Sequence, residues 1–127
     1  MENQVLSIEQ MKRLKELGVY VNPKGKCLMY TSDSSDDYYL KYGESTCEDD
    51  IKAFSLQDLI ELLPKSIIIN SAKHWFCVGP NCRPTEFQLM YIDGDDSYAV
   101  MKQDKSLLQA AYNMLIWVIE NGYLKTK

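Results

Sequence analysis

One histidine and two cysteines stand close together in the sequence, with the spacing His-x-x-Cys-x-x-x-x-Cys. His74, Cys77 and Cys82 are residue types that bind zinc, and a structural zinc site takes four such ligands, so that Cys27 or Cys47 would supply the fourth. The spacing matches no compact zinc motif. In a β-strand, His74 and Cys77 would also point to opposite faces, because alternate residues share a face. A metal-binding module at His74, Cys77 and Cys82 is therefore the alternative hypothesis for the function, and the main one involves no cofactor.

The other patterns that could support catalysis are incomplete. A cysteine nucleophile paired with His74 needs a third, orienting group, and nothing in the spacing indicates one. The acidic runs lack the ligand spacing of a calcium loop: Asp36-Asp37, Glu48-Asp49-Asp50 and Asp93-Gly94-Asp95-Asp96. A carboxylate pair in a cleft stays open as a further alternative. The sequence carries no phosphate-binding loop, dinucleotide fingerprint or nucleophile elbow, so the main prediction is a protein that is not an enzyme.

Tyrosine is the residue type whose distribution most suggests binding. Tyr30, Tyr38, Tyr39 and Tyr42 lie close together in the sequence, beside the acidic segments. Tyrosine combines a large contact area with one polar tip and is enriched in protein interfaces. These four residues are the predicted partner-binding set, for an unidentified protein partner. The other interpretation is that half of them pack on the edge of a sheet.

Helix signals occur at both ends of the chain and in its middle. The first helix is predicted over residues 6–17, where Ser7 and Gln10 form a capping box and Gly18 follows the last turn. The second is predicted over residues 55–63.

The last predicted helix contains the longest apolar run of the chain, Ala110–Ile119. Ser106 with Gln109 three residues later reads as a second capping box, and Gly122 stands where a helix ends. A bilayer needs about 20 apolar residues, so this run is too short to span one. Because the segment is apolar on nearly every side, we expect a buried helix that lies on the apolar face of a sheet.

The remaining ordered segments have the alternation of strands. Short connections between them leave no room for crossover helices, so the sheet is expected to be mainly antiparallel. The run Asp93–Asp96 predicts a hairpin turn, and prolines 80 and 84 exclude a central strand at that place. The predicted strands are Lys26–Tyr30, Ser66–Asn70, Lys73–Gly79, Glu86–Ile92 and Ser97–Lys102, with Tyr38–Tyr42 as a further candidate that pairs with the first. The fold class is therefore α+β: a mainly antiparallel sheet of four to six strands covered by three helices, in one two-layer domain over residues 1–127.

Composition limits the classes of partner. The formal net charge of −4 disfavours nucleic-acid binding, which needs a basic face. No secretory signal or membrane-spanning segment is visible. We therefore expect a cytoplasmic, acidic protein with reduced cysteines, and with neither nucleic acid nor membrane among its partners.

The helical segments carry a resemblance. Residues 54–65, residues 110–123 and the start of the chain over residues 6–18 resemble small uncharacterised proteins encoded by prophages and mobile elements of gut anaerobic bacteria. The resemblance implies no known activity. The resulting hypothesis is a non-enzymatic accessory protein of a phage or mobile element that acts through protein–protein binding. A homodimer, formed through an edge strand or an unburied part of the last helix, is a special case of that binding.

Overall fold

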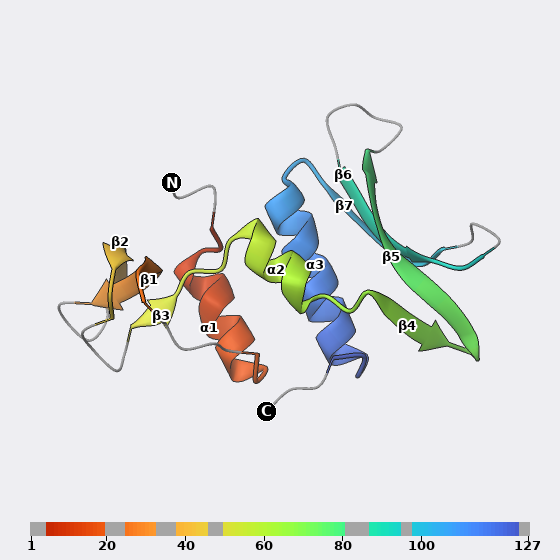
Figure 1. Ribbon diagram of the computed structural model, residues 1–127, viewed down its shortest axis with the longest axis horizontal. Helices are drawn as coiled ribbons and strands as arrows, with labels where there is room; N and C mark the ends of the chain where they lie inside the picture. The colour runs from red at the N-terminus through yellow and green to blue at the C-terminus, as the bar shows by residue number, and fades with distance from the viewer. Residues whose placement is uncertain are drawn as a thin grey trace. The chain divides into compact units, whose positions relative to one another are not determined.

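The computed structural model describes residues 5–19, 25–32, 38–45, 50–80, 87–94 and 98–124. These residues form two compact units, of which the first ends at Ser55 and the second begins at Leu56. The predicted α+β class is confirmed, because the described residues contain helices and antiparallel sheets (Figure 1). The prediction that residues 1–127 form one domain stays a prediction.

The first unit holds one helix and a three-stranded antiparallel sheet in the order β2-β1-β3. Its elements are α1 (Ile8–Glu16), β1 (Cys27–Ser32), β2 (Tyr38–Gly43) and β3 (Ile51–Lys52). The expected pairing of β2 with the strand before it is confirmed, and β1 extends beyond its predicted end at Tyr30. β3 was not predicted, because two residues are too few to show an alternation.

α1 begins and ends with the residues that the sequence indicated. The hydroxyl of Ser7 accepts a 3.2 Å hydrogen bond from the backbone N–H of Gln10, and the Gln10 side chain accepts one of 2.9 Å from the N–H of Ser7. After the helix, Gly18 takes a φ of 85°. The N–H of Gly18 donates to the carbonyl of Lys15, and the next N–H donates to that of Leu14. This is the Schellman ending, which a residue without Cβ adopts at least cost.

The core of the first unit joins the start of α1 to the segment that follows β3. The N–H of Leu6 donates a 2.9 Å hydrogen bond to the carbonyl of Phe54, whose own N–H donates to the sulfur of Met11 at 3.5 Å. All three side chains are buried. The other buried apolar side chains of this unit are Val5, Leu14, Val19, Met29, Tyr30, Ile51 and Ala53.

The second unit is a four-stranded antiparallel sheet with two helices. The strand order is β4-β5-β6-β7, and α3 packs against β6, β7 and α2 (Figure 1). Its elements are α2 (Leu56–Leu62), β4 (Ser66–Ile69), β5 (Ala72–Pro80), β6 (Phe87–Ile92), β7 (Tyr98–Asp104) and α3 (Leu107–Glu120). β6 and β7 pair as a hairpin, as predicted, although residues 95–97 of the connection lie outside the described residues.

One face of α3 supplies much of the core of this unit. The buried side chains of the helix are Ala110, Ala111, Met114, Leu115 and Val118. Their spacing forms a single apolar stripe, so the helix is buried along that stripe rather than on every side. Trp117 is half-buried and stacks on Tyr123 with ring centroids 5.5 Å apart. Among the described residues, no helix is both long and apolar enough to cross a membrane.

The capping of α3 agrees with the prediction only in part. Ser106 accepts a hydrogen bond from the N–H of Gln109 at 3.2 Å, as predicted. The reciprocal bond of a capping box is replaced, because the N–H of Ser106 donates to Asp104 at 2.9 Å and the Gln109 side chain donates to Asn113. At the other end, Gly122 has a φ of 79° and closes a second Schellman ending.

The strands form two sheets, although a single sheet of four to six strands was predicted. α2 separates β1–β3 from β4–β7 along the chain, and each strand pairs only within its own set. The proline rule was also misapplied, because Pro80 ends β5, a strand between two others. Pairing with β4 extends only to Trp75, so the last part of β5 is an edge that tolerates a residue without N–H.

Candidate functional site

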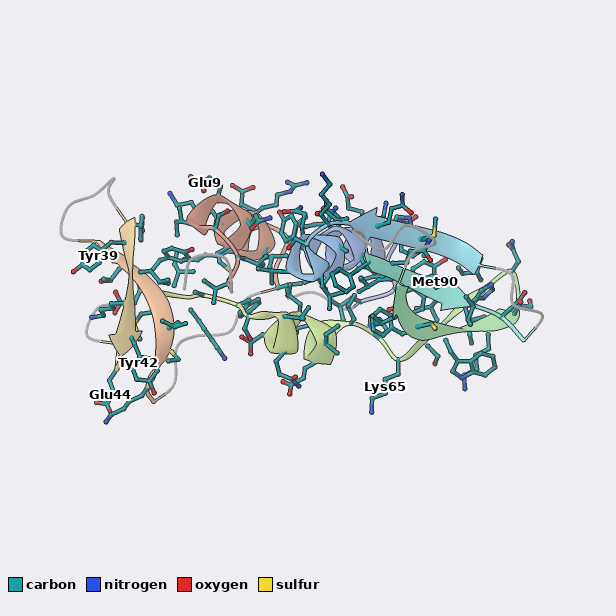
Figure 2. The ribbon with its side chains drawn as sticks, turned by 90° about the horizontal axis from the view of Figure 1, so that it is seen from above. Glu9, Tyr39, Tyr42, Glu44, Lys65 and Met90 are labelled. Atoms are coloured by element: carbon teal, nitrogen blue, oxygen red, sulfur yellow. The ribbon has the colours of Figure 1, made fainter. Side chains whose placement is uncertain are left out.

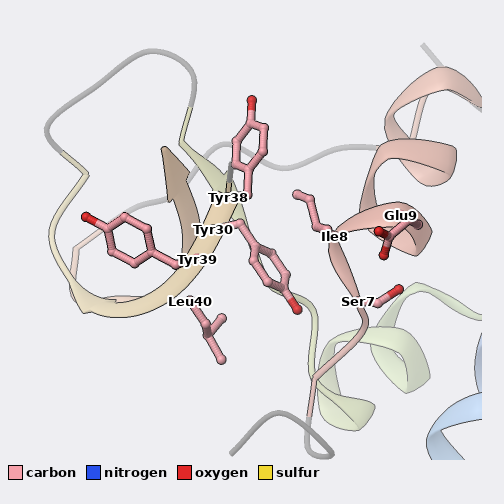
Figure 3. Close-up of a pocket in the computed structure, with 7 residues that line it drawn as sticks. All are labelled: Ser7, Ile8, Glu9, Tyr30, Tyr38, Tyr39 and Leu40. Carbon is pink, nitrogen blue, oxygen red and sulfur yellow. The ribbon is translucent and has the colours of Figure 1, made fainter. Parts of the chain in front are cut away.

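A pocket of about 330 Å³ lies in the first unit, between the start of α1 and the edge strand β2. Figure 3 shows its lining residues, with the ring of Tyr30 lying between β2 and the first turn of α1. The lining residues are Ser7, Ile8, Glu9, Tyr30, Tyr38, Tyr39 and Leu40. Sites for drug-sized ligands range upward from about 300 Å³. The pocket is at the lower end of that range, and a single side chain of a partner fits in it.

The capping of α1 positions one wall of this pocket. The two hydrogen bonds between Ser7 and Gln10 fix the first turn of the helix, which holds Ile8 and Glu9. Glu9 is exposed, and a carboxylate in the first turn also complements the positive end of the helix dipole. The helix therefore presents an aliphatic and an anionic side chain to the pocket.

The other wall is aromatic. The ring of Tyr38 already has a cation over it, since the Lys12 ammonium of α1 lies 4.9 Å from the ring centroid. Tyr39 is 47 % exposed, and its ring is turned away from Ile8 (Figure 3). Tyr38 and Tyr39 are consecutive, so they belong to opposite faces of β2, and the pocket lies where that edge strand borders the helix. The pocket combines a carboxylate with aromatic rings, and the Lys12 ammonium over the Tyr38 ring is an example of a cation bound by such a ring.

The structure divides the four predicted tyrosines into three groups. Tyr38 and Tyr39 line the pocket as exposed or half-exposed side chains. Tyr30 lines it too, but its hydroxyl donates a buried 2.6 Å hydrogen bond to the carbonyl of Leu6, so that residue holds the unit together. Tyr42 is 66 % exposed and lies well apart from Tyr39 along β2 (Figure 2), outside the pocket lining. Packing inside the unit therefore applies to Tyr30, and partner binding stays a prediction for the other three.

Sequence reasoning missed the helical wall of the pocket. It gave Glu9 and Lys12 no role, because the spacing of charged residues on a helix carries no sign of a nearby strand. The acidic residues Asp33, Asp36, Asp37, Glu48 and Asp49 lie outside the described residues. Asp50, from the same acidic region, is only 2 % exposed and accepts a 3.0 Å hydrogen bond from Ser45. That carboxylate is part of the interior of the unit and not of its acidic surface.

The residues of the metal hypothesis do not converge where they are described. His74 is buried on β5, with Nδ1 3.0 Å from the carbonyl oxygen of Ala72. Cys77 is three residues further along the same strand and so on its opposite face. Cys82 and Cys47 lie outside the described residues, and within the described ranges no three His, Cys, Asp or Glu residues are grouped to hold a metal ion. Metal binding that involves Cys82 stays a prediction.

The fold and this pocket define a small α+β protein with an aromatic, anionic surface pocket. Comparison with known proteins adds no family to that description: no protein-family model, curated protein or solved structure matches the chain.

Proposed function

We propose that this chain is a non-enzymatic, cytoplasmic binding protein whose α1–β2 pocket takes a lysine or arginine side chain of a protein partner. The observation that carries the proposal is the Lys12 ammonium 4.9 Å from the Tyr38 ring, the place that the partner's cation takes over, in a pocket whose lining includes the exposed Glu9. The resemblance of the helical segments to prophage and mobile-element proteins supports an accessory role in such an element.

Three properties of the pocket favour a basic side chain. A cation over a tyrosine ring gains about 0.5–1 kcal/mol at an exposed site, and the Lys12–Tyr38 contact has that geometry. Glu9 supplies a neighbouring negative charge, and the chain as a whole carries a net charge of −4, which attracts cationic segments at long range. Tyr39 offers an exposed ring beside the pocket for the backbone or flanking residues of the partner.

The first test uses an acetylated, amidated tri-lysine peptide and the isotope-labelled full-length chain in NMR titrations. We expect salt-sensitive shifts at Ile8, Glu9 and Tyr38, with no binding of a tri-glutamate peptide. Glu9→Gln should weaken the tri-lysine peptide by about 2- to 5-fold, the range of one exposed ion pair. The control is Glu16→Gln on the same helix, an exposed carboxylate outside the pocket lining.

The second test concerns the ring. Tyr38→Leu keeps an apolar side chain but removes the π face, so it should weaken the same peptide by about 2- to 5-fold. Tyr42→Leu on the same strand should leave the affinity unchanged, because Tyr42 does not line the pocket. A protein retained from host lysate counts as the partner only if it is lost with both Glu9→Gln and Tyr38→Leu and kept with both controls. Equal effects of test and control variants would refute the pocket as the binding site.

A further inference from the structure

The four-stranded sheet of the second unit carries large apolar side chains on both faces. On one face Ile67, Leu89 and Tyr91 are buried, and this is the face that α3 covers. Strand register places a second apolar set on the opposite face, because alternate residues of a strand point to opposite sides and paired residues to the same side. The apolar side chains of this open sheet face are Ile68, Trp75, Cys77, Met90, Ile92 and Met101, and its polar side chains include Ser66, Lys73, Gln88 and Gln103.

The open sheet face departs from the usual pattern of an antiparallel sheet, in which a face that is not packed on the core is polar. Ile68 is 66 % exposed and Trp75 is 48 % exposed. The other four apolar side chains of this face are half-buried, and one of them, Met90, is labelled in Figure 2. Exposed apolar side chains gathered on one face of a sheet are typical of a surface to which another molecule binds.

Charge indicates which molecule covers it. Within the described residues of the four strands, the one carboxylate is Asp104, and its register falls on the α3 side of the sheet, opposite Phe87. Among the described strand residues, the charged side chain on the open sheet face is a cation, Lys73, whose ammonium lies 5.7 Å from the Trp75 ring centroid. Two copies of a chain with net charge −4 repel one another over most of their surfaces. They approach with least repulsion through a face that has no carboxylate.

The shape of the open sheet face agrees with a second copy, and its area limits the strength of the association. Two antiparallel sheets pack face to face about 10 Å apart, so an exposed sheet face is complementary to itself. Four strands about 4.8 Å apart and about six residues long cover on the order of 300 Å². Two such faces bury less than the roughly 1,200 Å² of a stable complex, so the association is weak and concentration-dependent.

We propose that the open sheet face is a self-association surface, on which a second copy of this chain packs sheet against sheet as a two-fold dimer. The surface lies in the second unit and shares no residue with the α1–β2 pocket. The two proposals can therefore fail independently.

The test is sedimentation equilibrium of the full chain from about 1 µM to about 1 mM, the range in which a weak dimer dissociates. Ile68→Glu places a carboxylate in the proposed interface and should raise the dimer Kd by about 10-fold or more. The matched control is Val78→Glu: Val78 is another exposed aliphatic residue of the same sheet, at 46 % exposure, but on the opposite face. Because the added charge is the same, general repulsion is matched, and the control should stay within about 2-fold of wild type. A wild type that is monomeric at the highest concentration, or equal effects of the two variants, would overturn the proposal.

A second measurement needs no substitution. Cys77 belongs to the open sheet face and Cys27 to the first unit, and both are half-buried free thiols. Dimerisation should slow the alkylation of Cys77 as the chain concentration rises, while the rate at Cys27 stays constant, with both sites resolved by peptide mass spectrometry. A rate at Cys77 that is independent of concentration would contradict a dimer through this face.

Discussion

The hydroxyl of Tyr30 donates a 2.6 Å hydrogen bond to the backbone carbonyl of Leu6, a residue 24 positions earlier in the chain. The bond is buried, and it ties β1 to the segment that enters α1. Tyr30 pairs with Ile51 of β3 as well, so its backbone and its hydroxyl connect three parts of the first unit. Tyr30 is therefore a structural member of the tyrosine set, even though its ring lines the pocket.

Tyr30→Phe should destabilise the first unit with little effect on the binding of a cationic peptide. The variant leaves a buried carbonyl without its donor, at a cost of about 1–2 kcal/mol. Hydrogen exchange of the β1 and β2 amides should accelerate by about 5- to 30-fold. Tyr42→Phe is the control, because its 66 % exposed side chain should leave the exchange unchanged. Unaltered exchange in Tyr30→Phe would contradict the structural role.

Tyr91 gives the second unit a dependence on high pH. Its side chain is fully buried, its hydroxyl donates a 2.7 Å hydrogen bond to the carbonyl of Pro64, and burial raises the pKa of the phenol well above its usual value. The unfolded chain therefore releases this proton first as the pH rises. The stabilisation is complete below the unfolded-state pKa of about 10 and is lost above it, by up to about 1.4 kcal/mol per pH unit. Urea unfolding followed by circular dichroism should show this extra slope in wild type and not in Tyr91→Phe; parallel curves would exclude it.

Replacing the left-handed glycine after α3 should destabilise the second unit, whereas replacing another exposed glycine of the same unit should not. Gly122 has a φ of 79°, whereas Gly94 has no positive φ, and an added Cβ meets nothing within 4 Å at either position. Backbone strain is then the only difference between the two substitutions. Gly122→Ala should cost about 1–2 kcal/mol, and Gly94→Ala should be close to neutral. The two tryptophans both lie in the second unit, so their fluorescence in urea reports the comparison.

The turn between β4 and β5 offers a change of the opposite sign. Asn70 and Ser71 have φ values of 51° and 69°, and Ile69 pairs with Ala72, which defines a two-residue hairpin with both turn residues left-handed. Asn-Gly is the preferred sequence for this turn. Ser71→Gly should therefore stabilise the second unit by about 1 kcal/mol, the cost of holding a residue with Cβ in that region. A lower urea midpoint for the variant would contradict the turn assignment.

The sequence predicted the local features of this fold better than the long-range ones. Capping by Ser7 and the endings at Gly18 and Gly122 depend on residues within a few positions of each other, so their patterns are visible in the sequence. β3 joins β1 across many residues through a two-residue match, which no local pattern shows. The second set of apolar side chains on the large sheet was equally hidden, because the residues of neighbouring strands that share a face are fixed by a register between distant positions.

Of the residues that line the pocket, the sequence analysis singled out only the tyrosines as a binding set. The tyrosines of β2 attract notice by their number, but the approach of α1 to them is a tertiary relationship. Period-two alternation places Tyr39 and Tyr42 on opposite faces of β2. Alternation does not separate Tyr42 from the pocket, however, because Tyr38 shares the face of Tyr42, Tyr39 does not, and both line the pocket. Glu9 and Lys12 had no such signal, because an exposed charge on a helix looks the same with or without a strand beside it.

The packing of α3 is the relationship on which the second unit depends most. Leu115 is fully buried, and α3 contacts β6, β7 and α2, whereas its neighbour Ile116 is only half-buried. Leu115→Ala should cost about 2.5–5 kcal/mol, since it removes apolar contact and leaves a cavity. Ile116→Ala deletes a side chain of the same size from the same helix and should cost clearly less, because water and flexible neighbours refill a half-exposed site. Urea unfolding followed by tryptophan fluorescence measures both variants. Equal losses would mean that α3 does not rest on the sheet by the stripe that contains Leu115.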